Sequence, residues 1–341
     1  MRLLKFTVLI LILLSSIAPF LFPVAEETQT NEVIINEDSF ETPDWVKRAV
    51  FYQIFPDRFR DGNSSNNAWR SDWLWKKWGT RPLIMGWGWK PYGNNDYFGG
   101  DLQGVQEKAS YLADLGITAI YFNPTMDSTD NHGYTVIEYK SVGRYFGINH
   151  RDANGTLVLD YNASIEVFRN MTAALDEYGI KVILDGVFNH CSAKNMWFDI
   201  DNDYTTDGAY ENQSSPWYDW FIFYNWTTKN YKCWYGYEAM PEPEEVDAYK
   251  DYVYRADDSV LKFWNDLGVD GWRLDVGESV SHEFWKEFRS YYKALNPEGF
   301  IVGEHWGDAR SYLQGDEWDS TMNYPFRWAV LEWAKGGSVS T

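Results

Sequence analysis

Asp185, Asp275 and Glu304 each stand near the end of a short β-branched or aromatic run. Parallel β/α folds assemble their active sites at the carboxyl ends of the strands, so we expect these carboxyl groups to share one site. Two neighbouring carboxyl groups can divide a reaction between them. One attacks or stabilises a cationic carbon, and the other, protonated, gives its proton to the leaving oxygen. Cleavage of an acetal between two sugars needs this chemistry.

The neighbours of two of these acids predict opposite ionisation states. Arg273 stands two residues before Asp275, on the same face of the predicted strand, and a nearby opposite charge lowers the pKa of a carboxyl group by about 1–3. Glu304 is flanked by Val302 and Trp306, and apolar surroundings raise the pKa of a carboxyl group. The sequence therefore predicts an ionised Asp275 and a protonated Glu304. From these residues alone, a structural Arg-x-Asp ion pair remains an alternative.

The elements that would position these acids alternate along the chain. Strands are predicted at 49–55, 117–122, 180–187, 269–276, 300–304 and 321–324, and helices at 104–115, 164–178, 257–267 and 279–294. This alternation predicts a parallel sheet, and both a doubly wound sheet and a β/α barrel fit it. The sequence has no G-x-G-x-x-G or G-x-x-x-x-G-K-[ST] loop, so we predict no nucleotide cofactor.

The charge and the first residues limit the partners and the location. The 341 residues include 30 Lys and Arg against 50 Asp and Glu, a net charge of −20, which argues against a nucleic-acid partner. Residues 1–25 place Arg2 and Lys5 before an apolar run, which predicts a signal peptide and a secreted protein, with an uncleaved membrane anchor as the alternative. No second apolar stretch of that length follows. Residues 26–44 are predicted to be a linker, and the domain is predicted to span 45–341.

Three motifs in this order carry a resemblance to a known family. They are DGVFNH (185–190), GWRLDVGES (271–279) and IVGEHW (301–306), preceded by FYQIFPDRF and YFGGDLQGV. Together they resemble the signature regions of the α-amylase family of glycoside hydrolases (family 13). The similarity is greatest to its branch of neopullulanases, cyclomaltodextrinases and pullulan hydrolases. The resemblance covers the chain from about residue 45 onward and implies a (β/α)8 TIM barrel with an inserted domain B after the third strand.

The resemblance also implies roles for individual residues. Asp275 would be the nucleophile and Glu304 the acid/base of a retaining mechanism, with their carboxyl groups about 5–5.5 Å apart. The residues implied to bind substrate are Arg273, His190, Tyr134, His132 and Trp306, with Trp272 as a further candidate. Asp185 would be structural, and Asn189 would help to bind calcium. The family usually has an acidic residue directly after the tyrosine that matches Tyr134, where this chain has Thr135.

A second group of residues suggests a metal site. The segments DGNSSNN (61–67) and FGGD (98–101) concentrate carboxylate, amide and carbonyl oxygens, which favour a hard cation such as Ca²⁺. An ordinary Asn/Gly-rich turn is the alternative from the residues alone. The resembling branch binds calcium at the matching segment, which implies these ligands: Asp61, Asn63, Asn66, Asn67, Gly99 and Asp101.

The alternation of strands and helices stops between residues 191 and 243, where aromatic residues gather. A connection of this length is usually functional, and the resemblance implies that it is domain B, at about 190–250. We expect most of its rings to form a local core and a few to stack on sugars. Cys191 and Cys233 would form a disulfide or stay free thiols.

One departure from the family concerns the end of its barrel. The family's seventh strand ends in an Asn/Val-His-Asp motif with a third essential carboxylate, and no segment here matches that motif. We therefore expect an α/β fold with about six of the eight β/α units, and a 341-residue chain that is inactive or unstable on its own.

The predicted signal peptide and the family resemblance together imply a secreted, retaining α-glucan hydrolase. Its substrate would be starch, maltodextrin, cyclodextrin or pullulan, cleaved at α-1,4 bonds, with α-1,6 bonds left open. Two alternatives remain: a transglycosylase or α-glucosidase of the same family, and a secreted carbohydrate-binding protein without catalysis.

Overall fold

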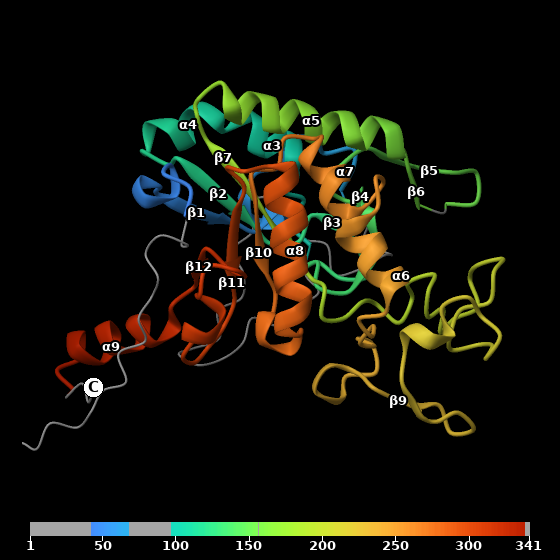
Figure 1. Ribbon diagram of the computed structural model, residues 1–341. Coiled ribbons are helices and arrows are strands. Elements are labelled where there is room, and N and C mark those ends of the chain that lie inside the picture. Colours follow the sequence, from blue (N-terminus) through green and yellow to red (C-terminus); the bar gives the residue numbers. More distant parts are fainter. Residues whose placement is uncertain (1–41, 68–96, 156, 338–341) are drawn as a thin grey trace, which may run out of the picture. The chain divides into compact units, whose positions relative to one another are not determined.

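The computed structural model describes residues 42–67, 97–155 and 157–337. The predicted signal peptide (1–25) and most of the predicted linker (26–44) lie outside the described residues. Six parallel strands form one sheet in the order of the chain (Figure 1): β1 (Phe51–Ile54), β2 (Ala119–Phe122), β7 (Lys181–Gly186), β10 (Gly271–Leu274), β11 (Phe300–Gly303) and β12 (Ser320–Thr321). A doubly wound sheet reverses its strand order at a switch point. This sheet does not, so it is the wall of an incomplete barrel.

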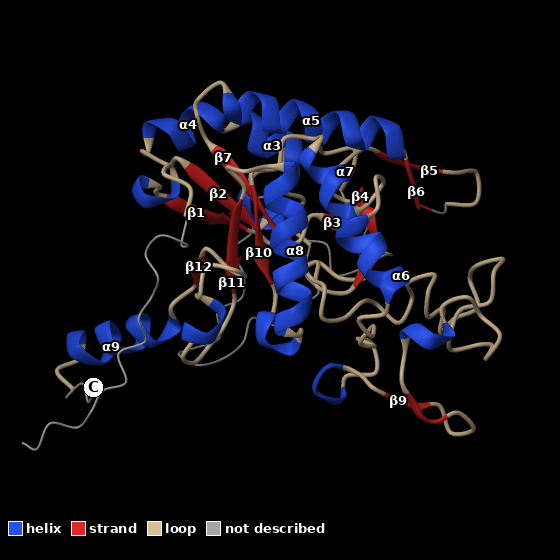
Figure 2. Ribbon diagram, viewed as in Figure 1, coloured by secondary structure: helices blue, strands red, loops and turns tan. Residues whose placement is uncertain are grey.

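Helices follow the strands, and three short antiparallel pairs are inserted between them (Figure 2). The α-helices are α2 (Pro56–Phe59), α3 (Leu102–Glu107), α4 (Ala109–Asp114), α5 (Tyr161–Asp176), α6 (Asp247–Lys250), α7 (Val260–Asn265), α8 (His282–Leu295) and α9 (Tyr324–Ala334). The pairs are β3 (Met126–Ser128) with β4 (Val136–Val142), β5 (Asn149–Arg151) with β6 (Leu157–Leu159), and β8 (Phe223–Asn225) with β9 (Asn230–Tyr231). Among the described residues, no helix has the length and apolar character that a membrane span requires.

Several predicted boundaries were wrong, and three of them have a local reason. The helix predicted at 104–115 is interrupted at Lys108, whose φ of −102° and ψ of 9° end α3. The helix predicted from 279 begins only after Ser281, because the Ser281 hydroxyl accepts the Phe284 N–H at 3.1 Å and caps α8. Tyr324, predicted to end a strand, is the first residue of α9.

Side chains of the strands alternate between two hydrophobic clusters, as the pleat of a strand requires. Ile120, Val182, Trp272 and Ile301 belong to the large cluster that the helices also join, whereas Tyr121, Ile183 and Phe300 form a smaller one. Residues two positions after this smaller set, on the same face of each strand, therefore point away from the large core. Asp185 and Val302 are among them.

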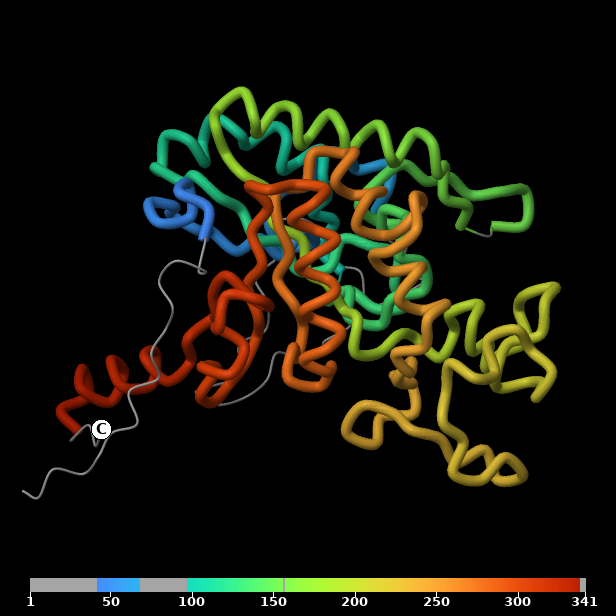
Figure 3. The backbone as a smooth tube through the Cα atoms, viewed as in Figure 1, coloured from blue at the N-terminus to red at the C-terminus, as the bar shows by residue number. Residues whose placement is uncertain are grey.

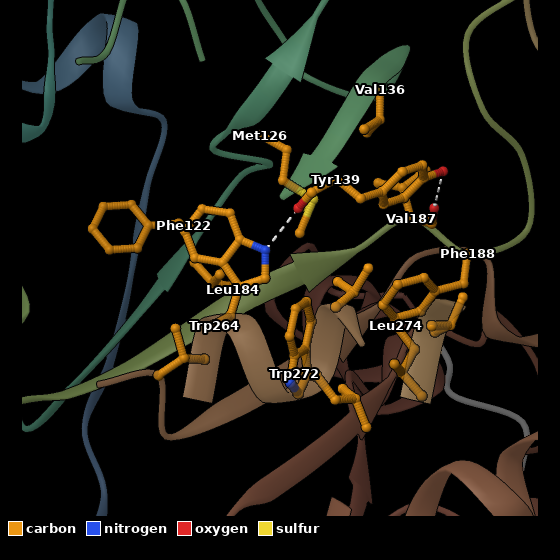
Figure 4. Packing of buried hydrophobic residues seen from close by; sticks show 14 of the residues in the cluster. Phe122, Met126, Val136, Tyr139, Leu184, Val187, Phe188, Trp264, Trp272 and Leu274 are labelled. Carbon is orange, nitrogen blue, oxygen red and sulfur yellow. Dashed lines mark hydrogen bonds between the residues drawn. The ribbon is translucent and has the colours of Figure 1, made fainter. Parts of the chain in front are cut away.

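Trp264 of α7 ties a helix to the inserted pair β3/β4 (Figure 4). Its indole N–H donates to the Tyr139 carbonyl at 2.8 Å, and the Tyr139 hydroxyl donates to the Val187 carbonyl at 2.8 Å. Both rings are buried, and Trp264 also packs edge-on against Phe168 at 4.7 Å between ring centroids. The contact fixes β4 beside the end of β7.

Residues 188–246 connect β7 to α6 with little regular structure (yellow to gold in Figure 3). The aromatic side chains of this segment pack on one another. Phe198, for example, contacts the rings of Tyr210, Phe221, Phe223 and Tyr231. Cys191 and Cys233 are free thiols, and both lie next to Pro241.

We predict that Trp264→Phe lowers the free energy of unfolding by about 1–3 kcal/mol, because the Tyr139 carbonyl loses its donor in a buried position. Urea unfolding measures the change. Trp333→Phe is the control, since Trp333 is 73% exposed, and its effect should stay within about 0.5 kcal/mol. Equal losses in the two variants would contradict the role given to Trp264.

Candidate active site

The strand register brings the predicted site residues to one end of the sheet. Arg273 of β10 is paired with Asp185 of β7 and with Val302 of β11. The ladder continues beyond the strands, since the N–H of Asp275 donates to the Gly186 carbonyl at 3.0 Å and that of Glu304 to the Leu274 carbonyl at 2.9 Å. Three neighbouring strands therefore present their acids side by side.

One guanidinium binds all three acids. Arg273 Nη1 lies 2.8 Å from Asp185 Oδ1 and 2.7 Å from Asp275 Oδ1, and Nη2 lies 2.7 Å from Glu304 Oε2. None of these four residues is more than 7% exposed. Asp275 and Glu304 thus contact the two terminal nitrogens of one planar guanidinium, which keeps their carboxyl groups close to each other.

The pKa expected for Asp275 was wrong in direction. Burial, first of all, and then the negative charge of Asp185 raise the pKa of Asp275 to about 8, although Arg273 opposes them. The nearby Glu304 adds to the rise. One positive charge among three buried carboxylates does not compensate their desolvation and mutual repulsion. The cluster therefore retains a proton near neutral pH.

The surroundings of Glu304 are polar, not apolar as its sequence neighbours suggested. The Val276 N–H donates to Glu304 Oε2 at 2.9 Å, and Trp306 Nε1 and the Tyr324 hydroxyl each donate to Oε1 at 3.2 Å. Val302 instead packs against the small hydrophobic cluster. Tyr324 was missed by the sequence analysis because its segment was interpreted as a strand.

Asp185 is held by two tyrosines as well as by Arg273. The Tyr134 hydroxyl donates to its Oδ2 at 3.0 Å, and the Tyr121 hydroxyl bonds the same oxygen. Tyr121 was not among the predicted site residues. His132 lies beside Tyr134, with 5.6 Å between ring centroids, and its Nδ1 is 2.9 Å from Asp130. Tyr134 therefore contacts the group formed by Arg273 and its three acids through Asp185, and His132 contacts Tyr134.

His190 lies close to the same group and is buried. Its Nε2 meets the Tyr134 carbonyl at 2.9 Å, and burial lowers its pKa to about 4, so the ring is neutral. Among the described residues its Nδ1 has no partner, and neither side-chain polar atom of the adjacent Asn189 has one. His190 is therefore a buried, neutral ring with one nitrogen that no described residue bonds.

The two tryptophan candidates differ in position. Trp306 is 60% exposed and bonded to Glu304, whereas Trp272 is fully buried against Phe188. Trp272 was a wrong candidate, because it alternates with Arg273 and so faces the helices. A cavity of about 420 Å³ opens at Glu304, and its lining includes four aromatic residues: Trp234, Tyr235, Tyr237 and Trp306.

The predicted calcium ligands lie on two segments, 61–67 and 99–101, that contact each other. Asp101 accepts the N–H groups of Gly62, Asn63 and Gly104, and Asp61 accepts a hydrogen bond from Asn67 at 3.0 Å. The Oδ1 atoms of Asn66 and Asn67 are buried and have no partner in the described part of the chain. A Cβ on Gly99 would meet Asn67 Oδ1 at 2.3 Å. Asn63 Oδ1 is already occupied by Ser65.

Comparisons with known proteins show which family this chain matches. Residues 53–340 match the family described as alpha amylase, catalytic domain. An amylopullulanase of Thermoanaerobacterium saccharolyticum is 34% identical over 90% of this chain, and neopullulanase 2 of Thermoactinomyces vulgaris is 35% identical over 90%. The solved cyclic α-maltosyl-(1→6)-maltose hydrolase of Arthrobacter globiformis is 30% identical, with a TM-score of 0.70 over 86% of this chain and 58% of that one. The chain spans only 25% of the amylopullulanase and 47% of the neopullulanase.

We predict that Asp275→Asn stabilises the folded chain at neutral and alkaline pH. An aspartate ionises near pH 4 when unfolded and at about pH 8 here, so its contribution to stability falls as the pH rises between these values. Asparagine carries no charge to desolvate. The melting temperature should rise by about 2 °C or more at pH 8, and the gain should vanish near pH 4.

Asp114→Asn, at an exposed position of α4, serves as the control and should change the melting temperature little at any pH. A destabilised Asp275→Asn variant at pH 8 would show that Arg273 outweighs burial.

Proposed function

Because the chain belongs to the α-amylase family, we propose that it carries the catalytic centre of a retaining α-glucan hydrolase. Its substrates would be starch, maltodextrin, cyclodextrin or pullulan, cleaved at α-1,4 bonds. The observation that supports this most is the contact of Asp275 and Glu304 with one guanidinium. Retaining glycosidases hold their two carboxyl groups about 5–5.5 Å apart, whereas inverting ones leave about 6.5–9.5 Å for a water molecule.

In the proposed reaction, the Asp275 carboxylate attacks the anomeric carbon while Glu304 gives its proton to the bridging oxygen. The bond between that carbon and that oxygen breaks, and a glycosyl ester on Asp275 forms. Water then attacks the same anomeric carbon while Glu304 takes the water's proton, and the bond between that carbon and the Asp275 oxygen breaks, which frees the carboxylate. The proton retained by the carboxylate cluster belongs to the group as a whole. The reaction requires that this proton reside on Glu304 and that Asp275 be ionised when substrate is bound.

The remaining residues would position the sugar. Arg273 fixes both carboxylates, and Asp185 fixes Arg273 through Nη1, the nitrogen that also binds Asp275. The neutral ring of His190 offers Nδ1 to a hydroxyl group, and Tyr134 and Trp306 offer ring faces near Asp185 and Glu304. His132 stands behind Tyr134.

We also propose that the turn at Asp61–Asn67 binds Ca²⁺ and that the chain is exported through residues 1–25. The unpartnered Oδ1 atoms of Asn66 and Asn67 support the metal site, since Ca²⁺ prefers several uncharged and carboxylate oxygens. Asp61 and the carbonyl of Gly99 would complete the set, and Asp101 would shape the turn. Among the described residues, no three His, Cys, Asp or Glu gather as a metal site, so amide oxygens have to supply much of the coordination.

The hydrolase proposal is tested by incubating the protein with starch, pullulan, β-cyclodextrin and maltotriose and measuring new reducing ends, with maltotriose binding measured by calorimetry. Asp275→Asn and Glu304→Gln should bind maltotriose and reduce hydrolysis at least 1,000-fold, about 4 kcal/mol of barrier. Absence of both binding and hydrolysis in the unaltered protein would contradict the proposal.

Calcium removal should lower the melting temperature by several degrees, because a ligand that binds only the folded chain stabilises it. Readdition of Ca²⁺ should restore the original value after treatment with a chelator. Asn67→Ala should no longer respond, whereas Asn170→Ala, at an exposed position of α5, should respond like the unaltered protein. A chelator response that Asn67→Ala retains would place the cation elsewhere.

A further inference from the structure

A second cavity lies across a loop from the cavity at Glu304. The loop is formed by residues 233–238. Three of its residues line the cavity at Glu304: Trp234, Tyr235 and Tyr237. The other three line a second cavity of about 290 Å³: Cys233, Gly236 and Glu238. The loop is therefore a wall that the two cavities share, and the proposed reaction uses only the first of them.

The hairpin of β8 and β9 supplies the rest of the second cavity and an exposed aromatic ring. Tyr224 of β8 lines this cavity and is 65% exposed. The preceding Phe223 packs with the rings of the connection, at 5.5 Å from Tyr218 and 5.8 Å from Tyr231 between ring centroids. Successive side chains of a strand point to opposite faces. Tyr224 is therefore turned away from those rings.

Backbone and side-chain contacts hold the hairpin and the loop together. The Tyr231 hydroxyl of β9 donates to the Glu238 carbonyl at 2.8 Å. Cys233, at the start of the loop, forms a β-bridge with Pro241. The second cavity is therefore already formed in the chain without a ligand, and a ligand that enters it has little chain to order.

The polar groups of the second cavity differ in their availability. Lys229 is occupied, because its ammonium group donates to the Tyr210 carbonyl and lies 3.1 Å from the centre of the Trp226 ring. The carboxylate of Glu238 and the side-chain amide of Asn230 line the cavity and are exposed, and no described residue bonds either of them. A carboxylate accepts hydrogen bonds from hydroxyl groups, and an amide both donates and accepts them.

From this arrangement we propose that the second cavity is an accessory binding site for the α-glucan chain. Tyr224 covers the apolar face of one glucosyl unit, and Glu238 accepts a hydrogen bond from a hydroxyl group of that unit. This inference rests on the proposed function. A glucan that crosses the loop 233–238 occupies both cavities at once, so its second contact is intramolecular and raises the overall affinity. An oligosaccharide that fills only the cavity at Glu304 gains nothing.

The test compares the binding of maltoheptaose and maltotriose by calorimetry in the Asp275→Asn background. The Kd for maltoheptaose should be at least about tenfold lower than that for maltotriose. Tyr224→Ala should reduce this difference to less than about threefold, and Glu238→Gln should reduce it by a smaller factor, while both leave the Kd for maltotriose unchanged. Tyr111→Ala is the matched control, since Tyr111 of α4 is 50% exposed, and should change neither Kd.

The thiol of Cys233 reports on the second cavity directly. Cys233 lines that cavity, whereas Cys191 is fully buried. Maltoheptaose should slow the alkylation of Cys233 by iodoacetamide at least about fivefold, because the bound glucan covers the thiol. Peptide mass spectrometry measures the rate, and Cys191 should stay unmodified in the folded chain. Tyr224→Ala should remove the protection, and Tyr111→Ala should keep it.

Three results would overturn the accessory site and leave the hydrolase proposal intact. They are equal Kd values for the two oligosaccharides in the Asp275→Asn protein, a Tyr224→Ala variant that keeps the tenfold difference, and a rate of Cys233 alkylation that maltoheptaose does not change. If neither oligosaccharide binds to the Asp275→Asn protein or to the unaltered one, the proposed function fails and this inference with it.

Discussion

A single guanidinium, that of Arg273, lies between three buried carboxylates, and the arrangement of the site depends on it. Asp185, Asp275 and Glu304 are each within 2.8 Å of its nitrogens. A buried ion pair recovers its desolvation cost only when every remaining polar atom is bonded. Tyr121 and Tyr134 meet this need on Asp185, and the Val276 N–H and Tyr324 meet it on Glu304. Burial, and then the negative charge of Asp185, raise the pKa of Asp275 and keep a proton in the cluster near neutral pH.

The sheet allows this arrangement because successive side chains along each strand point to opposite faces of the sheet. One face of each strand packs into the large core with the helices, and the other carries the polar residues at the strand end. Close packing behind the site makes some positions intolerant of any side chain. A Cβ on Gly303 would meet the Trp318 ring at 2.1 Å, and one on Gly277 would meet it at 2.6 Å. Trp318 is also the base on which Tyr312 and then His305 rest. The packing behind the strands therefore also fixes the position of His305.

The sequence was sufficient to predict the six strands, their parallel arrangement and the convergence of the acids, because strand ends and their spacing follow local patterns. It was not sufficient for the protonation of Asp275. The adjacent Arg273 is visible in the sequence, whereas the burial and the charge of Asp185 that outweigh it arise only from tertiary packing. Trp272 could have been excluded, because alternation with Arg273 already places it on the core face. Tyr121 and Tyr324 carry no local signal, since their hydroxyl groups reach the site from other strands and helices. The split of the predicted helix 104–115 at Lys108 was likewise not readable from its apolar spacing.

The account is tested most directly by trapping the nucleophile. Incubation with 5-fluoro-α-glucosyl fluoride, followed by peptide mass spectrometry, reports which carboxylate forms a glycosyl ester, and it does so even when turnover is slow. If Arg273 holds Asp275 against the anomeric carbon and Glu304 beside the leaving group, a single adduct should form on Asp275 and be absent from Asp275→Asn. An adduct on Asp185 or Glu304, or no adduct in a protein that binds maltotriose, would contradict the arrangement described for the guanidinium and its three acids.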